Sequence, residues 1–219
     1  MKVILFGATG MVGQAVLGEC LRDDGVESVL SIARSPTGKS HPKLRELLRQ
    51  DLFDATVPDA QLQGYDACFY CLGVSSAGMS EAEYTRLTYD LTLAWARVLA
   101  RIDPDMAFLY VSGAGTGGKS MWAQVKGRTE AALRGLFRAA YMVRLAMLRP
   151  VHGEVSKTRW TRIAYTVFGP IAPLIQALAP SVVISTEELG RAMIRAARER
   201  PPTHVLEMKD LHALADRPG

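Results

Sequence analysis

The chain has 219 residues and a mass of 23.9 kDa, which is enough for one domain with a sizeable core. Apolar residues make up 48% of the sequence and charged residues 22%, so the composition is that of a globular protein and excludes a disordered or fibrous chain. The net charge is only +4, and no basic run is interleaved with aromatic residues, so we expect no nucleic-acid partner.

Strand-like and helix-like segments alternate along the chain. Short apolar runs predict strands at Lys2–Phe6, Ser28–Ala33, Ala67–Cys71, Ala107–Val111, Tyr141–Leu148 and His204–Glu207, with a weaker one near Leu47–Asp51. Helical periodicity predicts helices at Met11–Arg22, Ser80–Arg101, Ser120–Ala140 and Glu187–Arg198. Ser80 and Glu83 form a capping box at one helix start. This alternation predicts a three-layer α/β domain with a doubly wound parallel sheet, continuous over residues 1–219.

Three glycines separate the first strand from the first helix in the sequence GATGMVG. We expect Gly7 to allow a tight turn, Gly10 to let the backbone approach a pyrophosphate, and Gly13 to let the helix pack close to the sheet. The free N–H groups at the helix N-terminus then face the anion, aided by the helix dipole. The turn predicts a Rossmann-like dinucleotide site. Its expected contacts are Gly7, Thr9, Gly10, Met11, Val12 and Gly13.

The end of the second strand distinguishes the two nicotinamide dinucleotides. An NAD site normally places Asp or Glu there to bind the adenosine ribose. This sequence has Ala33, then Arg34 and Ser35, and no acid. Arg34 can pair with a 2′-phosphate and stack beside the adenine, the alternative being an ordinary exposed loop arginine. We therefore expect NADP(H) to contact Arg34 and Ser35, with NAD(H) less favoured.

Five motifs appear in a diagnostic order: GATGMVG, DLFD at 51–54, CLGVSS at 71–76, YVSGAG at 110–115 and VKGRTE at 125–130. On these motifs the sequence resembles the atypical or extended short-chain dehydrogenase/reductase superfamily over about its first two-thirds. It is similar to bacterial NAD(P)-binding epimerase-like proteins, which in turn resemble the animal Tat-interacting tumour-suppressor protein. The motifs identify the superfamily but no substrate.

The resemblance implies roles for residues at matching positions. Ser112 matches the serine that polarises a substrate carbonyl, and Lys126 matches the lysine that hydrogen-bonds the nicotinamide ribose, so these two are the candidate catalytic residues. Further contacts are implied along the cofactor, from the adenine through the pyrophosphate to the nicotinamide. These implied contacts are Asp51, Leu52, Leu72, Gly73, Val74, Lys126 and Pro150.

One residue departs from the superfamily pattern. The superfamily places a catalytic tyrosine four residues before the lysine, where the lysine charge lowers the pKa of the phenol. This chain has Trp122 there, and an indole N–H cannot exchange a proton usefully at neutral pH. Tyr84 and Tyr89 lack the diagnostic spacing and are expected to pack, while His152 follows the sixth strand and could transfer a proton or be a turn residue.

Residues 163–184 form a stretch of 22 residues without a charge. Its length would suffice to span a bilayer, but Gly169, Pro170, Pro173 and Pro180 argue against one regular helix. We expect a short apolar helical extension within residues 153–186 that covers the cofactor, lines a substrate pocket or forms a homodimer contact. Lys157, Arg159 and Arg162 leave peripheral membrane contact open.

Cysteines and charge distribution complete the expectations. The apolar run of the first residues is too short for a signal peptide, and three cysteines cannot all pair, which favours the cytoplasm. Cys68 and Cys71 lack the second ligand pair of a zinc site, so we expect no metal. Ten Lys and Arg residues in Lys119–Arg162 favour an anionic partner, a plain solvated surface being the alternative.

The sequence thus supports two hypotheses. The first is an NADP(H)-dependent oxidoreductase or epimerase-like enzyme that acts on a small molecule. The second is a non-catalytic NADP(H)-binding sensor or interaction protein, which Trp122 keeps open.

Overall fold

The computed structural model describes residues 1–151 and 182–217. Seven strands in these ranges form one sheet in which every neighbouring pair is parallel. Their spatial order is β3 (Leu44–Leu48), β2 (Ser28–Ala33), β1 (Lys2–Phe6), β4 (Ala67–Tyr70), β5 (Ala107–Gly113), β6 (Ala140–Leu145) and β9 (Val205–Leu206). The strand order reverses between β1 and β4, which is the topological switch point of a doubly wound sheet.

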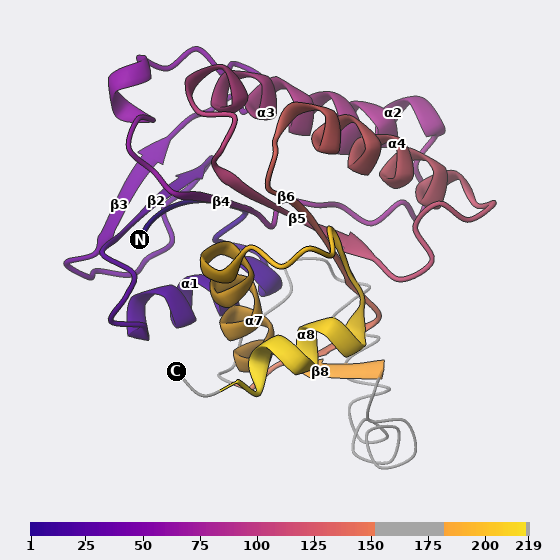
Figure 1. The fold of residues 1–219 in the computed structure, drawn as a ribbon. Helices are drawn as coiled ribbons and strands as arrows, with labels where there is room; N and C mark the ends of the chain where they lie inside the picture. The colour runs from indigo at the N-terminus through magenta and orange to yellow at the C-terminus, as the bar shows by residue number, and fades with distance from the viewer. Residues whose placement is uncertain (152–181, 218–219) are drawn as a thin grey trace.

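Helices cover both faces of the sheet, as Figure 1 shows. Below the sheet in that view lie α1 (Met11–Arg22), α7 (Thr186–Glu199) and α8 (Met208–Ala215). Above it lie α2 (Glu81–Thr85), α3 (Leu91–Ile102) and α4 (Met121–Leu136). A π-helical turn, Arg86–Asp90, joins α2 to α3, and a 3₁₀ turn, Asp59–Gln61, precedes β4. The predicted three-layer α/β fold with a Rossmann-like parallel sheet is confirmed.

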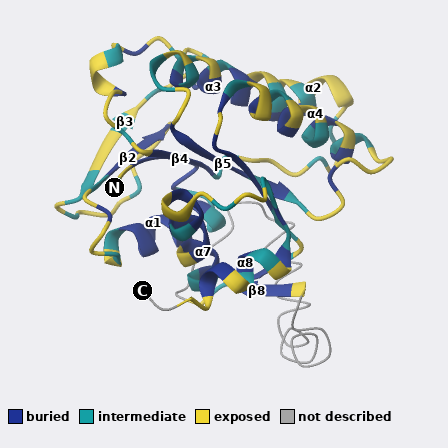
Figure 2. Ribbon diagram, in the orientation of Figure 1, coloured by how far each residue is buried: buried dark blue, intermediate teal, exposed yellow. Residues whose placement is uncertain are grey.

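The sequence of β1 shows why the central strands are apolar throughout. Val3 and Leu5 pack in the core between the sheet and helices α1 and α7. Ile4 and Phe6 pack in the core between the sheet and helix α3. Successive side chains of a strand point to opposite faces, so a strand with helices on both faces needs an apolar residue at every position. Figure 2 shows these inner strands buried along their length.

Two element boundaries differ from the prediction on the C-terminal side of the sheet. The strand predicted at Tyr141–Leu148 is two strands, because the chain leaves the sheet after β6 and β7 (Met147–Arg149) pairs with β8 (Val183–Ser185) instead. The helix predicted to reach Ala140 ends at Leu136. It ends early because the Ala139 carbonyl is needed as the acceptor for Phe108 N, at 2.8 Å, where β6 begins beside β5.

Other predicted elements lie close to their expected positions. The capping box is confirmed, with Glu83 N donating to Ser80 Oγ at 3.3 Å and Ser80 N donating to Glu83 Oε2 at 2.9 Å. The weak strand lies at β3, three residues before its predicted start, because pairing with β2 sets its register and its side chains are mostly exposed. Helix α8 was not predicted. It is short, and its capping box uses Glu207 rather than a Ser or Thr.

The uncharged stretch falls mostly outside the described residues. Val183 and Ile184, at its end, are buried in strand β8 rather than in a helix. His152 and the proposed helical extension up to residue 181 are not among the described residues. None of the helices in residues 1–151 and 182–217 combines the length and apolar character that a membrane crossing requires.

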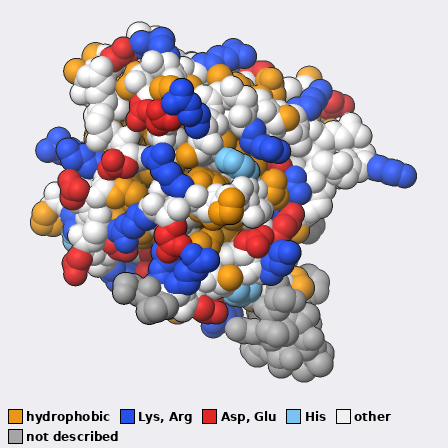
Figure 3. Space-filling view, in the orientation of Figure 1, with side chains coloured by type: hydrophobic (Ala, Val, Ile, Leu, Met, Phe, Trp, Pro, Cys, Tyr) orange, Lys and Arg blue, Asp and Glu red, His pale blue; other side chains and the backbone are white. Residues whose placement is uncertain are grey.

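The basic run beginning at Lys119 does not form one basic face in the described part of the chain. Arg138 pairs with Asp105, and Arg144 pairs with Glu130, so acids brought in by the fold offset much of its charge. Figure 3 shows Lys and Arg side chains interspersed with Asp and Glu side chains over the face in view.

A buried hydrogen bond from Trp95 joins helix α3 to the segment that follows β3. Its indole Nε1 donates to the Leu52 carbonyl at 2.7 Å, and the side chain is fully buried beside Phe6. Trp95→Phe should therefore lower the free energy of unfolding by about 1–3 kcal/mol, because the buried carbonyl loses its donor. Urea denaturation measures this loss.

Arg101→Met is a suitable control, because the Arg101–Asp59 pair lies on the surface. Exposed pairs contribute about 0–1 kcal/mol, so this variant should unfold nearly as the parent does. A Trp95→Phe protein as stable as the control would show that the hydrogen bond contributes nothing.

Candidate functional site

The predicted site residues gather at the carboxyl edge of the sheet. Gly7 follows β1, Arg34 follows β2, Leu72 follows β4, and Ser112 lies near the end of β5. Because the strands are parallel, these ends lie along one edge, with the switch point between β1 and β4 at its centre. Lys126 joins them from helix α4.

Backbone packing explains two of the three glycines in the turn. Gly7 has φ +80°, and a Cβ there would lie 2.7 Å from the Cys71 backbone. A Cβ on Gly13 would lie 2.0 Å from the Gly7 carbonyl oxygen, so helix α1 touches the turn directly. Both expectations, the tight turn and the close helix packing, are confirmed.

Gly10 differs from the other two glycines. Its backbone is extended, with φ −86° and ψ 165°, and a Cβ would meet nothing nearer than the Gly7 oxygen at 3.4 Å. Within the described residues, then, the packing of the protein does not require a glycine here. The turn is fixed by Gly10 N donating to Gly7 O at 2.9 Å and by Gln14 Nε2 donating to Thr9 O at 3.0 Å. A bare backbone at Gly10 therefore leaves room for a group outside the chain.

Helix α1 begins beside this open position. Its N-cap, Gly10, makes no side-chain capping bond, and its first turn holds no acidic residue. The first N–H groups of a helix have no acceptor within the helix and carry partial positive charge. Met11, Val12 and Gly13 thus form an N-terminus suited to an anion such as a phosphate.

The end of β2 presents a cation to the same edge. Ala33 is buried, whereas Arg34 and Ser35 are exposed. The structure gives Arg34 no hydrogen bond or ion pair within residues 1–151 and 182–217. The loop that follows is held to β3 by Thr37 N, which donates to Glu46 Oε1 at 2.7 Å. The Arg34 guanidinium is free to bind a ligand.

The implied adenine side is a mixture of structural and accessible groups. Asp51 Oδ1 accepts from Phe53 N at 2.8 Å, and buried Leu52 holds its carbonyl to Trp95. Past β4, Leu72 is half-buried, and Gly73 and Val74 are exposed. Leu48, at the end of β3, and Val74, in the loop that follows β4, are 50% and 42% exposed. These large apolar side chains at one edge are available to a ligand.

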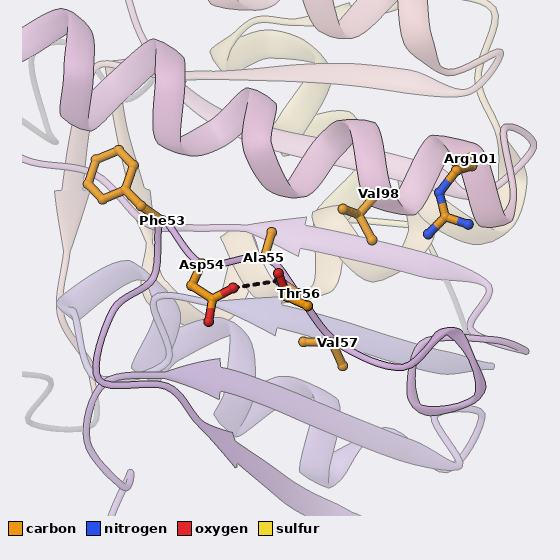
Figure 4. A pocket seen from close by; sticks show the side chains of 7 residues that line it. All are labelled: Phe53, Asp54, Ala55, Thr56, Val57, Val98 and Arg101. Carbon is orange, nitrogen blue, oxygen red and sulfur yellow. Dashed lines mark hydrogen bonds between the residues drawn. The ribbon is translucent and has the colours of Figure 1, made fainter.

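A cavity of about 380 Å³ lies next to this region, between helix α3 and the segment before β4. Figure 4 shows Val98 and Arg101 entering it from α3, opposite residues of the 53–57 segment. Its charges are already compensated, because Asp54 pairs with Arg49 and Arg101 pairs with Asp59. The sequence predicts no site at this cavity. Because Asp54 and Arg101 are both in ion pairs, neither of these lining residues offers an unpaired charge to a ligand.

Ser112 is buried, and its hydroxyl is engaged. Ser112 Oγ lies 2.9 Å from Thr116 Oγ1, which in turn donates to the Gly113 carbonyl at 2.7 Å. A hydroxyl has one proton, so Thr116 uses its proton on Gly113 and Ser112 donates to Thr116. Sequence reasoning missed Thr116, although it lies directly after the YVSGAG motif.

Lys126 reaches the end of β5 from helix α4. Its Nζ donates to the Val111 carbonyl at 3.3 Å and lies 5.1 Å from the centroid of the Tyr110 ring. Burial lowers the pKa of Lys126 to about 8, and the attraction of Glu130 opposes that change only partly. The ammonium is thus largely protonated at neutral pH and loses its proton just above it.

Trp122 lies one helical turn before Lys126, against the end of β5. A Cβ on Gly113 would lie 3.4 Å from Trp122 Cζ3, so the indole covers the backbone of this strand end. Tyr84 is buried, and burial raises its phenol pKa, so it does not replace the missing tyrosine. Pro150 follows β7, and His152 lies outside the described residues.

Comparison of the sequence with known proteins covers about half of the chain. No protein-family model matches the chain. One curated relative, the leucinostatins biosynthesis cluster protein T of Purpureocillium lilacinum, is 28% identical over 117 residues, which cover 51% of this chain and 42% of that protein. The chain therefore aligns with less than half the length of this relative.

Solved structures match over nearly the whole chain. A UDP-glucose 4-epimerase of Thermotoga maritima has a TM-score of 0.64 at 13% identity, covering 90% of this chain and 73% of its own. The Bordetella bronchiseptica enzyme WbmH, in complex with NAD+, has 0.65 at 17%, covering 97% and 79%. A short-chain dehydrogenase/reductase superfamily protein of Agrobacterium tumefaciens, with bound NAD, has 0.66 at 14%, covering 97% and 81%.

The chain has the short-chain dehydrogenase/reductase fold. The fold that the predicted resemblance implies is confirmed, while membership of the superfamily stays a prediction of the motifs. The parallel strand order and the helices on both faces of the sheet are the parts of this chain that carry the likeness.

The two glycines of different character give a direct test of the site. Gly13→Ala should destabilise the protein by about 1–3 kcal/mol, because its Cβ overpacks the turn. Gly10→Ala should change stability by less than about 0.5 kcal/mol, since nothing in the chain crowds that position. Only Gly10→Ala should yield a well-folded protein with weakened NADP+ binding.

Thermal denaturation and calorimetric titration measure these two effects separately. Unchanged NADP+ affinity in folded Gly10→Ala would show that the backbone at this position does not approach the ligand.

Proposed function

We propose that the chain binds NADP(H) at the carboxyl edge and acts as an oxidoreductase or epimerase-like enzyme on a small molecule. The observation that carries the proposal is the difference between the three glycines. Gly7 and Gly13 are required by the packing of the chain itself, whereas Gly10 leaves an opening beside the N-terminus of α1. Such an opening suits a pyrophosphate, which accepts hydrogen bonds from backbone N–H groups.

Arg34 favours NADP(H) over NAD(H) in this proposal. It is exposed at the end of β2, where a 2′-phosphate would lie, and the preceding residue is Ala33 rather than an acid. Two structural neighbours, WbmH and the Agrobacterium protein, have NAD bound. NAD(H) is therefore the competing cofactor, and the charge at Arg34 decides between the two.

The catalytic part of the proposal assigns one role to each of two residues. Lys126 would donate a hydrogen bond to the nicotinamide ribose. Ser112 would polarise a substrate carbonyl by redirecting its hydroxyl hydrogen bond from Thr116 to that carbonyl. A bound nicotinamide supplies or accepts a hydride. Exposed Leu48 and Val74 provide apolar surface for the adenosine end.

A second candidate function follows from Trp122. The indole covers the strand end beside Lys126 and carries no exchangeable acid, so the chain could bind the cofactor without turning over a substrate. In that case the protein is a cofactor sensor or an interaction protein.

Cofactor preference is testable by calorimetric titration with NADP+ and NAD+. NADP+ should bind more tightly in the parent protein, and Arg34→Ala should reduce its advantage by about tenfold or more, as expected for loss of a charge-assisted pair. Arg22→Ala is a control, because Arg22 pairs with Glu19 at the far end of helix α1. Equal affinities for both nucleotides in the parent protein would refute the role of Arg34.

Catalysis is testable by following NADPH oxidation with panels of carbonyl compounds and sugar nucleotides. The enzyme proposal expects turnover that Lys126→Ala reduces by about 10²-fold or more, as for loss of a group acting in the reaction. Tight NADP+ binding with no turnover, together with a change of oligomeric state on binding, supports the sensor instead.

We also propose a cytoplasmic location, because Cys20, Cys68 and Cys71 are free thiols. A homodimer and peripheral membrane contact stay predictions of the sequence.

A further inference from the structure

Buried charges connect helix α4 to the C-terminal part of the sheet. Glu130 lies one helical turn after Lys126 and is only 5% exposed. Arg144 of β6 binds both of its carboxylate oxygens, with Nη2 to Oε2 at 2.6 Å and Nε to Oε1 at 3.1 Å. The remaining nitrogen of Arg144, Nη1, donates to Glu207 Oε1 at 3.2 Å, directly before α8. The guanidinium therefore holds two acids at once.

This arrangement keeps Glu130 away from Lys126. The two residues are four apart on one helix, a spacing at which Lys and Glu commonly pair. Lys126 Nζ instead donates to the Val111 carbonyl and faces the Tyr110 ring. Among the residues for which the structure gives side chains, no ion pair joins Lys126 to an acid.

We propose that Arg144 is a positioning residue for Lys126: by binding Glu130 at both oxygens, it keeps the Lys126 ammonium at the end of β5, free for the dinucleotide. The dinucleotide part of this statement rests on the proposed function. The coupling between Arg144, Glu130 and Lys126 does not.

The physical reason is the cost of an unpaired buried charge. Without Arg144, the buried Glu130 carboxylate needs another cation, and Lys126 is one helical turn away. The pair would draw the ammonium from Val111 toward Glu130. Arg144 is well placed for this control, because it lies opposite Ser112 in the β5–β6 register.

The groups around Lys126 come from three elements. Tyr110 faces it from β5, Glu130 lies on its own helix, and Arg144 of β6 acts on it through Glu130. Burial raises the pKa of Tyr110 well above its usual value, so this phenol is neutral throughout the range in which Lys126 titrates. Glu130, compensated by Arg144, is thus the acid that controls the Lys126 charge.

The test is an NMR titration of lysine ¹³Cε signals in the cofactor-free protein, with Lys126 assigned by the loss of its signal in Lys126→Arg. The parent Lys126 should titrate with a pKa of about 8. Arg144→Met should raise this pKa by about one unit or more, because an opposite charge becomes free to pair with the ammonium. Adding Glu130→Gln to Arg144→Met should return it to the parent value or below.

Arg138→Met is a control, since Arg138 pairs with Asp105 on the surface, where its Nη1 donates to both carboxylate oxygens at 2.7 Å. It should leave the Lys126 titration unchanged. The proposal is overturned by an unchanged Lys126 pKa in folded Arg144→Met, or by a rise that persists when Glu130→Gln is added. Should Arg144→Met not fold, Arg144→Lys takes its place. It keeps a cation beside Glu130, so the Lys126 pKa should stay near the parent value in that variant and should rise when Arg144→Gln removes the charge; no rise in folded Arg144→Gln overturns the proposal as well.

The same variants separate this inference from the proposed function. Arg144→Met should weaken NADP+ binding about tenfold, as expected for one lost hydrogen bond to a charged group, and Glu130→Gln should restore it. If the parent protein binds neither NADP+ nor NAD+, the proposed function fails, while the Lys126 titration still decides the role of Arg144.

Discussion

Helix α1 touches the turn after β1 through backbone alone, because no side chain stands between Gly13 and Gly7. A Cβ at Gly13 would lie 2.0 Å from the Gly7 oxygen, so any other residue would push the helix outward. This contact holds the N-terminus of α1 at the carboxyl edge of the central strand, where the strand order reverses. The open backbone at Gly10, the exposed guanidinium at Arg34 and the apolar side chains at Leu48 and Val74 all lie along the edge that it fixes.

The other half of the site depends on buried charge. Lys126 is a cation in a largely apolar setting, and its pKa is low because burial disfavours its charged form. A nearby acid would cancel this effect, and Glu130 is such an acid. The structure resolves the conflict by giving Glu130 a different partner, Arg144, from a strand on the opposite side of β5 from β4. The contact of α1 with Gly7 thus sets the position of the glycine turn, and the ion pair between α4 and β6 sets the surroundings of the Lys126 charge.

In the proposed function, Trp122 separates the binding of a dinucleotide from a reaction with it. The parts that suit the cofactor, from Gly7 to Val74, belong to the first half of the sheet. The parts that would act on a substrate, Ser112 and Lys126, belong to the second half, and there the usual phenol is absent. An indole preserves the packing against Gly113 while removing the proton donor. Both proposed functions are therefore compatible with the observed packing of Trp122 against Gly113.

The sequence by itself determined the inner strands, the glycine turn and helix α1. The inner strands follow from apolar residues at every position. The turn before α1 follows from Gly7, because glycine adopts a φ of +80° freely. It also placed Ser112 and Lys126 at one edge through their motifs. Only the tertiary structure decided that Ser112 donates to Thr116, that the chain turns away after Leu145 to pair β7 with β8, and that Arg144 holds Glu130. These outcomes depend on which neighbours the fold brings to each polar group, and most of those neighbours lie on other elements of the chain, where no local pattern records them.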